Sequence, residues 1–214
     1  MKRVVKKQDH KKKNVPSKKI SIKDYAETLA DIKNRIQNAQ VKATMSANRE
    51  LIELYWEIGE IINEKQEKNG WGSSTIEKLS KDIQNLFPGM RGFSRANLFY
   101  MKAFCLAYQK VQKASGQLED LPIFNIPWWH NVILLTKLKD NAERFWYAQK
   151  AIENGWSGNV LEMRIQSKIY QREGKAITNF SQTLSKPHSD MAHRSLKDPY
   201  LFDFLEHTDE HLEK

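Results

Sequence analysis

Apolar residues recur at helical spacing through most of the chain, and no stretch alternates convincingly between apolar and polar positions. From Ser21 onward the apolar positions are spaced 3, 4, 3, 4, 3 and 4 residues apart, which predicts a helix that ends near Met45. These positions are Ile22, Tyr25, Leu29, Ile32, Ile36, Ala39 and Ala43. A second helix is expected from Ser46 to Lys68, paired with the first as an antiparallel hairpin. The pattern therefore predicts an all-α, multi-helix bundle.

Three junctions between predicted helices share a pattern of glycine, an aromatic residue and serine. They are Gly70, Trp71, Gly72 and Ser73; Gly92, Phe93 and Ser94; and Gly155, Trp156 and Ser157. Glycine accepts the left-handed conformation that ends many helices, and serine accepts hydrogen bonds from free amides at the next helix start. The aromatic residues at these junctions are therefore expected to pack over helix ends.

Further helices follow from the same signals. They are expected at 74–86, opened by Ser74 and Glu77, at 94–113 and 128–139, at 140–155, capped by Asp140 with Glu143, and at 157–172. A loop is expected around 118–127, and Pro187, His188 and Ser189 are typical of a linker. The predicted organisation is a disordered basic arm (1–20), a helical domain (21–186), and a linker with a short C-terminal segment (187–214).

The positive charge is concentrated at the start of the chain. The formal net charge of the 214 residues is +9, and residues 1–23 alone hold ten Lys or Arg against one Asp. Because the remaining residues balance, any attraction to a polyanion belongs mainly to this arm. Its candidate nucleic-acid contacts are Lys11, Lys12, Lys13, Lys18 and Lys19. A tail that only improves solubility is the alternative.

Composition narrows the class of protein. Hydrophobic residues make up 40% of the chain and charged residues 29%, with only 9 Gly and 6 Pro, as in a globular helical protein. No apolar run is long enough for a membrane span, and no secretion signal is evident. The single cysteine, Cys105, cannot form an intramolecular disulfide. A cytoplasmic protein without membrane contact is expected.

The segment from Ser74 to Lys113 has the plan of a helix-turn-helix. Between residues 86 and 114 there are five basic residues and no acidic one. The candidate nucleic-acid contacts in this segment are Arg91, Arg95, Asn97, Lys102, Lys110 and Lys113. Arg and Asn can pair with guanine and adenine edges. However, Asn97 and Lys102 are the only polar residues between 96 and 108, so this helix is expected to be mostly buried and to contact phosphates instead of bases.

Other chemical signals are weak. Six glutamates spaced 3 and 4 residues apart line one face of the predicted 46–68 helix: Glu50, Glu53, Glu57, Glu60, Glu64 and Glu67. They are interpreted as a solvated surface or as a dock for the basic arm or a basic partner. Asp203, His207 and His211 are spaced four residues apart, so on a helix they would share one face, as metal ligands can. The preferred interpretation is adventitious metal binding and not a functional metal site. His130 and Cys105 are expected to be packed in the core. No catalytic residue, metal site or cofactor is predicted.

Five stretches, in order between Asp24 and Leu205, resemble one known family. They are LYWEIGEII (54–62), LSKDIQNLFPGMRGFSRANLFYMKAFCLAY (79–108), IPWWHNVILLTKLKD (126–140), WYAQKAIENGWSGNVLEMRIQSKIYQREGKAITNF (146–180) and DPYLFDFL (198–205). They resemble the N-terminal helical domain, itself of unknown function, of the bacterial YhcG-type family, whose members are classed as PD-(D/E)XK nucleases. The resemblance implies a following nuclease domain with an acidic residue and an E-x-K motif on adjacent strands.

That nuclease domain is expected to be missing here, because the sequence ends nine residues after Leu205. The triplet Glu173, Gly174 and Lys175 matches E-x-K but is interpreted as a coincidence, since it lies at a predicted helix end. The expected function is that of a non-catalytic DNA-binding or DNA-positioning module for a nuclease domain or subunit. The alternatives are a protein-interaction or homo-oligomerisation module, and part of a nuclease that acts in DNA processing or defence.

Overall fold

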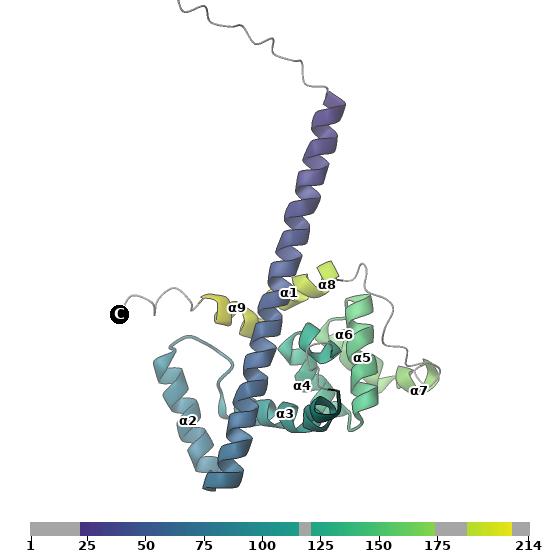
Figure 1. Cartoon of the computed structure of the whole chain (residues 1–214). Helices are drawn as coiled ribbons and strands as arrows, with labels where there is room; N and C mark the ends of the chain where they lie inside the picture. The colour runs from purple at the N-terminus through teal and green to yellow at the C-terminus, as the bar shows by residue number, and fades with distance from the viewer. Residues whose placement is uncertain (1–21, 116–120, 174–187, 207–214) are drawn as a thin grey trace, which may run out of the picture. The chain divides into compact units, whose positions relative to one another are not determined.

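The computed structural model describes residues 22–115, 121–173 and 188–206. Every regular element in these ranges is a helix (Figure 1). The elements are α1 (Ile22–Asn69), α2 (Ser73–Leu86), α3 (Arg95–Ser115), the 3-10 helix η1 (Pro122–Asn125), α4 (Trp128–Lys137), α5 (Asn141–Asn154), α6 (Gly158–Gln166), α7 (Ile169–Glu173), α8 (His188–Leu196) and α9 (Pro199–Glu206). The predicted all-α, multi-helix class is confirmed. The predicted basic arm at 1–20 lies outside the described residues.

The helical hairpin predicted for residues 21–68 is wrong, because α1 is one continuous helix of 48 residues. Ser46 resembles the start of a new helix, but no glycine or proline occurs between residues 22 and 58 to interrupt the first one. Asn48 is buried and donates from Nδ2 to the carbonyl oxygens of Phe124 (3.4 Å) and Ile126 (3.2 Å). The predicted break therefore falls where tertiary contacts hold the helix.

The chain divides into two compact units, at Gln37 and Asn38. The described part of the first unit is the beginning of α1. Arg35 Nε donates to Asp31 Oδ2 there at 2.8 Å, one helical turn away. The second unit holds the rest of α1 and all the other helices.

The core of the second unit is aromatic. Phe104 of α3 is fully buried and makes edge contacts with Trp56 of α1, Tyr108 and Trp128, with ring centroids 5.7, 5.3 and 5.5 Å apart. Such edge-to-face pairs stabilise a core beyond the area they bury. The expectation that α3 is mostly buried is confirmed, and Trp56 and Trp128 are also buried in this core. The nearby Trp129, by contrast, is 51% exposed.

Several helix ends follow the predicted capping chemistry. The side chains of Ser94, Asp140 and Ser157 each accept a hydrogen bond from a backbone amide three residues later. Gly155 ends α5 in the left-handed conformation, with φ of 58°. The predicted caps at Ser94, Asp140 and Ser157 are confirmed. They could be predicted from the sequence because each cap depends only on neighbouring residues.

Two predicted helix boundaries are wrong. Helix α2 begins at Ser73, with Gly72 at its N-cap and no side-chain cap, so the capping box of Ser74 and Glu77 does not form. The helix predicted from 157 to 172 is divided into α6 and α7 at Lys168, whose φ is 51°.

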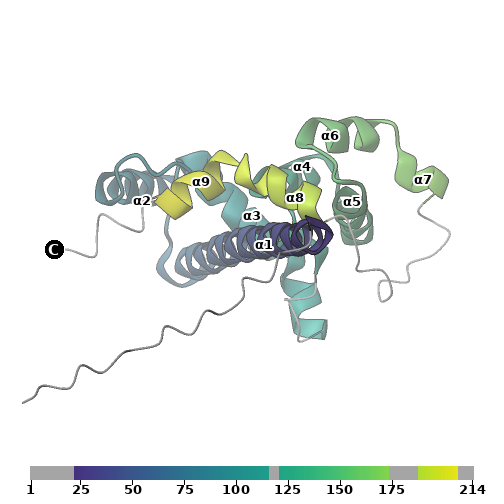
Figure 2. The same ribbon diagram turned by 90° about the horizontal axis from the view of Figure 1, so that it is seen from above.

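Helices α8 and α9 pack onto the core in place of the predicted linker. His188 and Ser189 begin α8, and Met191 and Leu201 are completely buried. Figures 1 and 2 both show α9 (yellow) beside the segment that joins α2 to α3. Among the helices in the described ranges, none combines the length and apolar character that a bilayer crossing requires.

Candidate nucleic-acid interface

The segment between α2 and α3 is held in one conformation by its glycines and its carbonyl groups. Gly92 has a φ of 106°, and a Cβ there would collide with Tyr55 Oη and lie 3.1 Å from Tyr200 Cδ1. Ser80 Oγ (2.6 Å) and Gln84 Nε2 (3.2 Å) both donate to the carbonyl oxygen of Phe93. The predicted turn is therefore a fixed connection that touches both α1 and α9.

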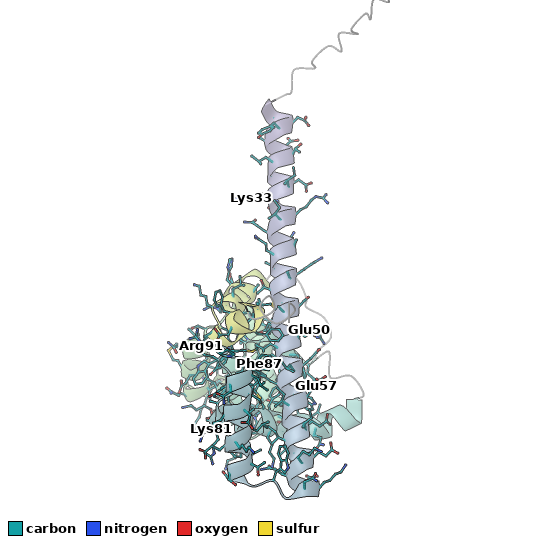
Figure 3. All side chains as sticks on the ribbon, turned by 90° about the vertical axis from the view of Figure 1, so that its left-hand side faces the viewer. Lys33, Glu50, Glu57, Lys81, Phe87 and Arg91 are labelled. Carbon is teal, nitrogen blue, oxygen red and sulfur yellow. The ribbon has the colours of Figure 1, made fainter. Side chains whose placement is uncertain are left out.

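Arg91, a predicted phosphate contact, is bound by Asp203 of α9. Its Nε lies 2.8 Å from Asp203 Oδ2, its Nη2 3.2 Å from Oδ1, and its backbone amide 3.0 Å from Oδ2. The Asp203 side chain is only 6% exposed, whereas that of Arg91 is 68% exposed. Figure 3 shows Arg91 beside α9. This pair neutralises the Arg91 charge and ties α9 to the α2–α3 segment.

An open hollow of about 610 Å³ lies next to this pair. Phe87, Met90, Arg91 and Tyr200 are among its lining residues. The pKa of Tyr200 is raised mainly by burial of its hydroxyl group, and the nearby Asp198 carboxylate raises it further. The phenol is therefore neutral near neutral pH, and the hollow offers a mostly apolar wall with one paired cation.

Arg95 and Lys102 lie on the side of α3 that faces the junction of α1 and α2. Arg95 is exposed, its Nη2 hydrogen-bonds Ser73 Oγ, and its Cζ lies 5.1 Å from the centre of the Phe99 ring. Lys102 Nζ donates to Gln66 Oε1 of α1. Because Gln66 and Ser73 flank the same corner, the structure brings these two predicted contacts to one surface.

That surface is not uniformly positive. The pKa of the exposed Glu77 carboxyl lies below its usual range. The main cause is the hydrogen bond and charge of Lys81, and the charge of Arg95 lowers the pKa further. The Glu77 carboxylate therefore offsets part of the Arg95 charge. Attraction to phosphate at this surface should be modest.

Asn97, predicted to contact bases, is part of the core. It is 5% exposed, and its Nδ2 donates to the Gly92 carbonyl oxygen. Its Oδ1 accepts a hydrogen bond of 2.7 Å from Trp128 Nε1. Both ends of the amide are thus occupied inside the fold, and the interface proposed below omits this residue.

The structure does not describe the side chains of the remaining predicted contacts. Lys110 and Lys113 lie within α3, but only their backbone is described. All of the predicted arm contacts, Lys11, Lys12, Lys13, Lys18 and Lys19, lie outside the described residues, as do His207, His211, Gly174 and Lys175.

The predicted glutamate stripe is present on α1 and mostly exposed. Figure 3 shows Glu50 and Glu57 on the side of α1 away from Lys81 and Arg91. Glu53 is half-buried and its Oε1 accepts a 2.9 Å hydrogen bond from Arg49 Nε. The face carrying Glu50 and Glu57 would repel a nucleic acid, so α1 limits where the phosphates can lie.

Two residues with reactive side chains, His130 and Cys105, are buried as predicted. His130 is 4% exposed, its Nε2 lies 2.9 Å from the Trp156 carbonyl oxygen, and burial lowers its pKa. Cys105 is buried, which raises its pKa to about 11. Within the described ranges no three His, Cys, Asp or Glu residues are arranged to hold a metal ion.

Comparison with known proteins places the chain among its relatives. Residues 31–172 match the model of the DUF1016 N-terminal domain. The chain is 26% identical over 221 residues to an Escherichia coli (strain K12) protein named "Putative nuclease YhcG", covering 88% of this chain and 58% of that protein. The chain thus spans little more than half the length of this relative, and no solved structure matches it. Since the family match covers most of the sequence and most of the described helices, the chain belongs to the DUF1016 N-terminal domain family.

Proposed function

We propose that this chain binds DNA without cutting it and positions the DNA for a nuclease domain or subunit. The distribution of cations carries the proposal: ten basic residues lie in positions 1–23, and four basic residues besides the neutralised Arg91, with no acidic residue, lie in positions 86–114. The relative named a nuclease supports DNA as the polyanion. Such a division of labour leaves the metal-dependent chemistry to carboxylates outside the described helices.

Binding by the helical body should use phosphates and little base recognition. Helix α3 buries most of its surface, and Arg95 and Lys102 are its two described cations. Lys110 and Lys113 follow them along the same helix. Contacts of this type orient a duplex but carry no sequence information directly. We therefore expect weak, salt-sensitive binding by the body, to which the basic arm adds affinity.

The direct test is fluorescence anisotropy with a labelled duplex of about two helical turns. The variant Arg95→Glu/Lys102→Glu should bind roughly tenfold more weakly in a chain lacking residues 1–20, because two attractive charges become repulsive. The matched control is Lys139→Glu/Lys197→Glu, which makes the same change in net charge at two exposed positions away from the α1–α2 corner. Arg91 is left intact, because a glutamate there would face Asp203.

The two variants separate specific from general electrostatics. If both weaken binding equally, only net charge matters and the proposed α3 surface is wrong. If neither changes binding while both stay helical by circular dichroism, the helix-turn-helix interpretation fails as well.

A protein-interaction module is the second candidate function. It is favoured by a specific observation, the exposed apolar side chains on the part of α1 before Gln37. A soluble helix normally buries such a stripe against a partner. This function is compatible with DNA binding, because the two would use different surfaces.

A further inference from the structure

The beginning of α1 exposes a row of large apolar side chains. Tyr25, Leu29, Ile32 and Ile36 are 60, 53, 47 and 54% exposed, and they are spaced 4, 3 and 4 residues apart. This spacing matches the a and d positions of a heptad, which form the seam of a coiled coil. Ala39 and Ala43 continue the same spacing in the sequence. The row therefore has the spacing that one side of a helix–helix interface requires.

Charges along this segment are polarised. Residues 22–31 contain three acidic side chains and one basic, whereas residues 32–43 contain three basic side chains and no acidic one. Asp24, Glu27 and Asp31 lie away from the apolar row, so these charges act on pairing through the net charge of each half, which is −2 for residues 22–31 (three acidic, one basic) and +3 for residues 32–43. A parallel pair would set the two acidic halves side by side and the two basic halves side by side. Net charge therefore favours the antiparallel direction over the parallel one.

We propose that residues 22–43 of two copies of this chain pair as an antiparallel coiled coil. Side-chain sizes fit this register: Leu29 packs against Ile32 of the second copy, and Tyr25 packs against Ile36. The flanking residues are compatible with this register, because Lys33 faces Ala26 and Arg35 faces Thr28 across the seam. No cation then faces a cation directly at these flanking positions.

The interface is short, so the dimer is in exchange with the monomer. About three heptads give an area at or below that of a standard interface. We expect a dissociation constant on the order of micromolar. The proposal is independent of DNA binding, because none of these residues belongs to the α3 surface.

Sedimentation velocity of the full chain tests the association. The concentration should be varied from about 1 to about 100 μM, a range that brackets the expected dissociation constant. The expected result is a shift toward twice the monomer mass of 25.1 kDa. Leu29→Glu/Ile32→Glu should remain monomeric, because each change puts a charge into the seam. The matched control, Ala30→Glu/Asn34→Glu, adds the same charge on the outer face and should leave the dimer intact. All four positions are exposed in the single chain, so folding should survive and circular dichroism should confirm it.

Cross-linking tests the direction. Chains carrying Tyr25→Cys mixed with chains carrying Ile36→Cys should form a mixed disulfide under mild oxidation, because these positions meet in the antiparallel register. Tyr25→Cys alone should not cross-link, since the two copies of position 25 lie about 16 Å apart at 1.5 Å per residue. The natural Cys105 should not interfere, because it is buried and has a pKa of about 11.

Three results would overturn the proposal. A strict monomer over the whole concentration range would assign the row to a different protein partner. A dimer that survives Leu29→Glu/Ile32→Glu would place the interface elsewhere. Self-cross-linking of Tyr25→Cys alone would show a parallel pair and contradict the charge argument.

Discussion

The ion pair between Arg91 and Asp203 should stabilise the fold unequally from its two ends. Asp203 is nearly buried, at 6% exposure, and accepts two hydrogen bonds from the guanidinium and one from the Arg91 backbone amide. The Arg91 side chain is 68% exposed. Replacing Arg91 therefore leaves a buried carboxylate with less support, whereas replacing Asp203 leaves a guanidinium that water can reach.

The hydrogen bonds and burial of this pair determine how much stability each substitution should cost. Arg91→Met removes two charge-assisted hydrogen bonds from the buried carboxylate, so the free energy of unfolding should fall by about 2–3 kcal/mol. Asp203→Asn keeps one oxygen acceptor and strands no buried charge, and should cost about 1 kcal/mol. The double variant should cost less than the sum of the two, because the second change removes the charge that the first one strands.

Urea unfolding followed by circular dichroism measures these values, provided that the transition is two-state. Glu77→Gln is a suitable control, since it removes an ion pair of 3.0 Å that is exposed at both ends, and it should leave the free energy of unfolding nearly unchanged. The reasoning is refuted if Asp203→Asn costs as much as Arg91→Met, or if the two changes are additive. Either result would mean that the carboxylate is hydrated and that α9 is not fixed by this contact.

Three further predictions concern cleavage, salt and pH. The purified chain should not nick plasmid DNA with Mg²⁺ or Mn²⁺, and co-purifying nicking that disappears in Glu173→Ala would contradict this. If the basic arm neutralises roughly six phosphates, log K against log salt should have a slope near −5, and removing residues 1–20 should flatten most of it; an unchanged slope in anisotropy titrations would exclude the arm from the interface. Burial lowers the pKa of His130, so below about pH 6.5 protons bind preferentially to the unfolded chain and stability should fall as pH falls, by at most about 1.4 kcal/mol per pH unit. Urea unfolding between about pH 7.5 and 5.5 should show a smaller loss in His130→Gln, and an equal loss would assign the pH dependence to other groups.

The sequence alone determined the helical class and much of its local detail. Apolar spacing near 3.6 residues identified the helices, and the caps at Ser94, Asp140 and Ser157 formed as expected. The scarcity of polar residues between 96 and 108 correctly indicated that α3 is central. These features could be predicted because helix period, capping and average burial depend on residues within a few positions of one another.

Tertiary structure decided which polar residues face solvent and where α1 continues. Ser46 carries a local helix-start signal, but the surrounding helix formers and the contacts of Asn48 with η1 and Ile126 outweigh it. Asn97 and Arg91 resemble nucleic-acid contacts in the sequence, yet Asn97 is bound inside the core and Arg91 is paired with Asp203, 112 residues away. No local pattern encodes such a pairing, because the free energy of a buried hydrogen bond depends on which distant segment the fold brings against it.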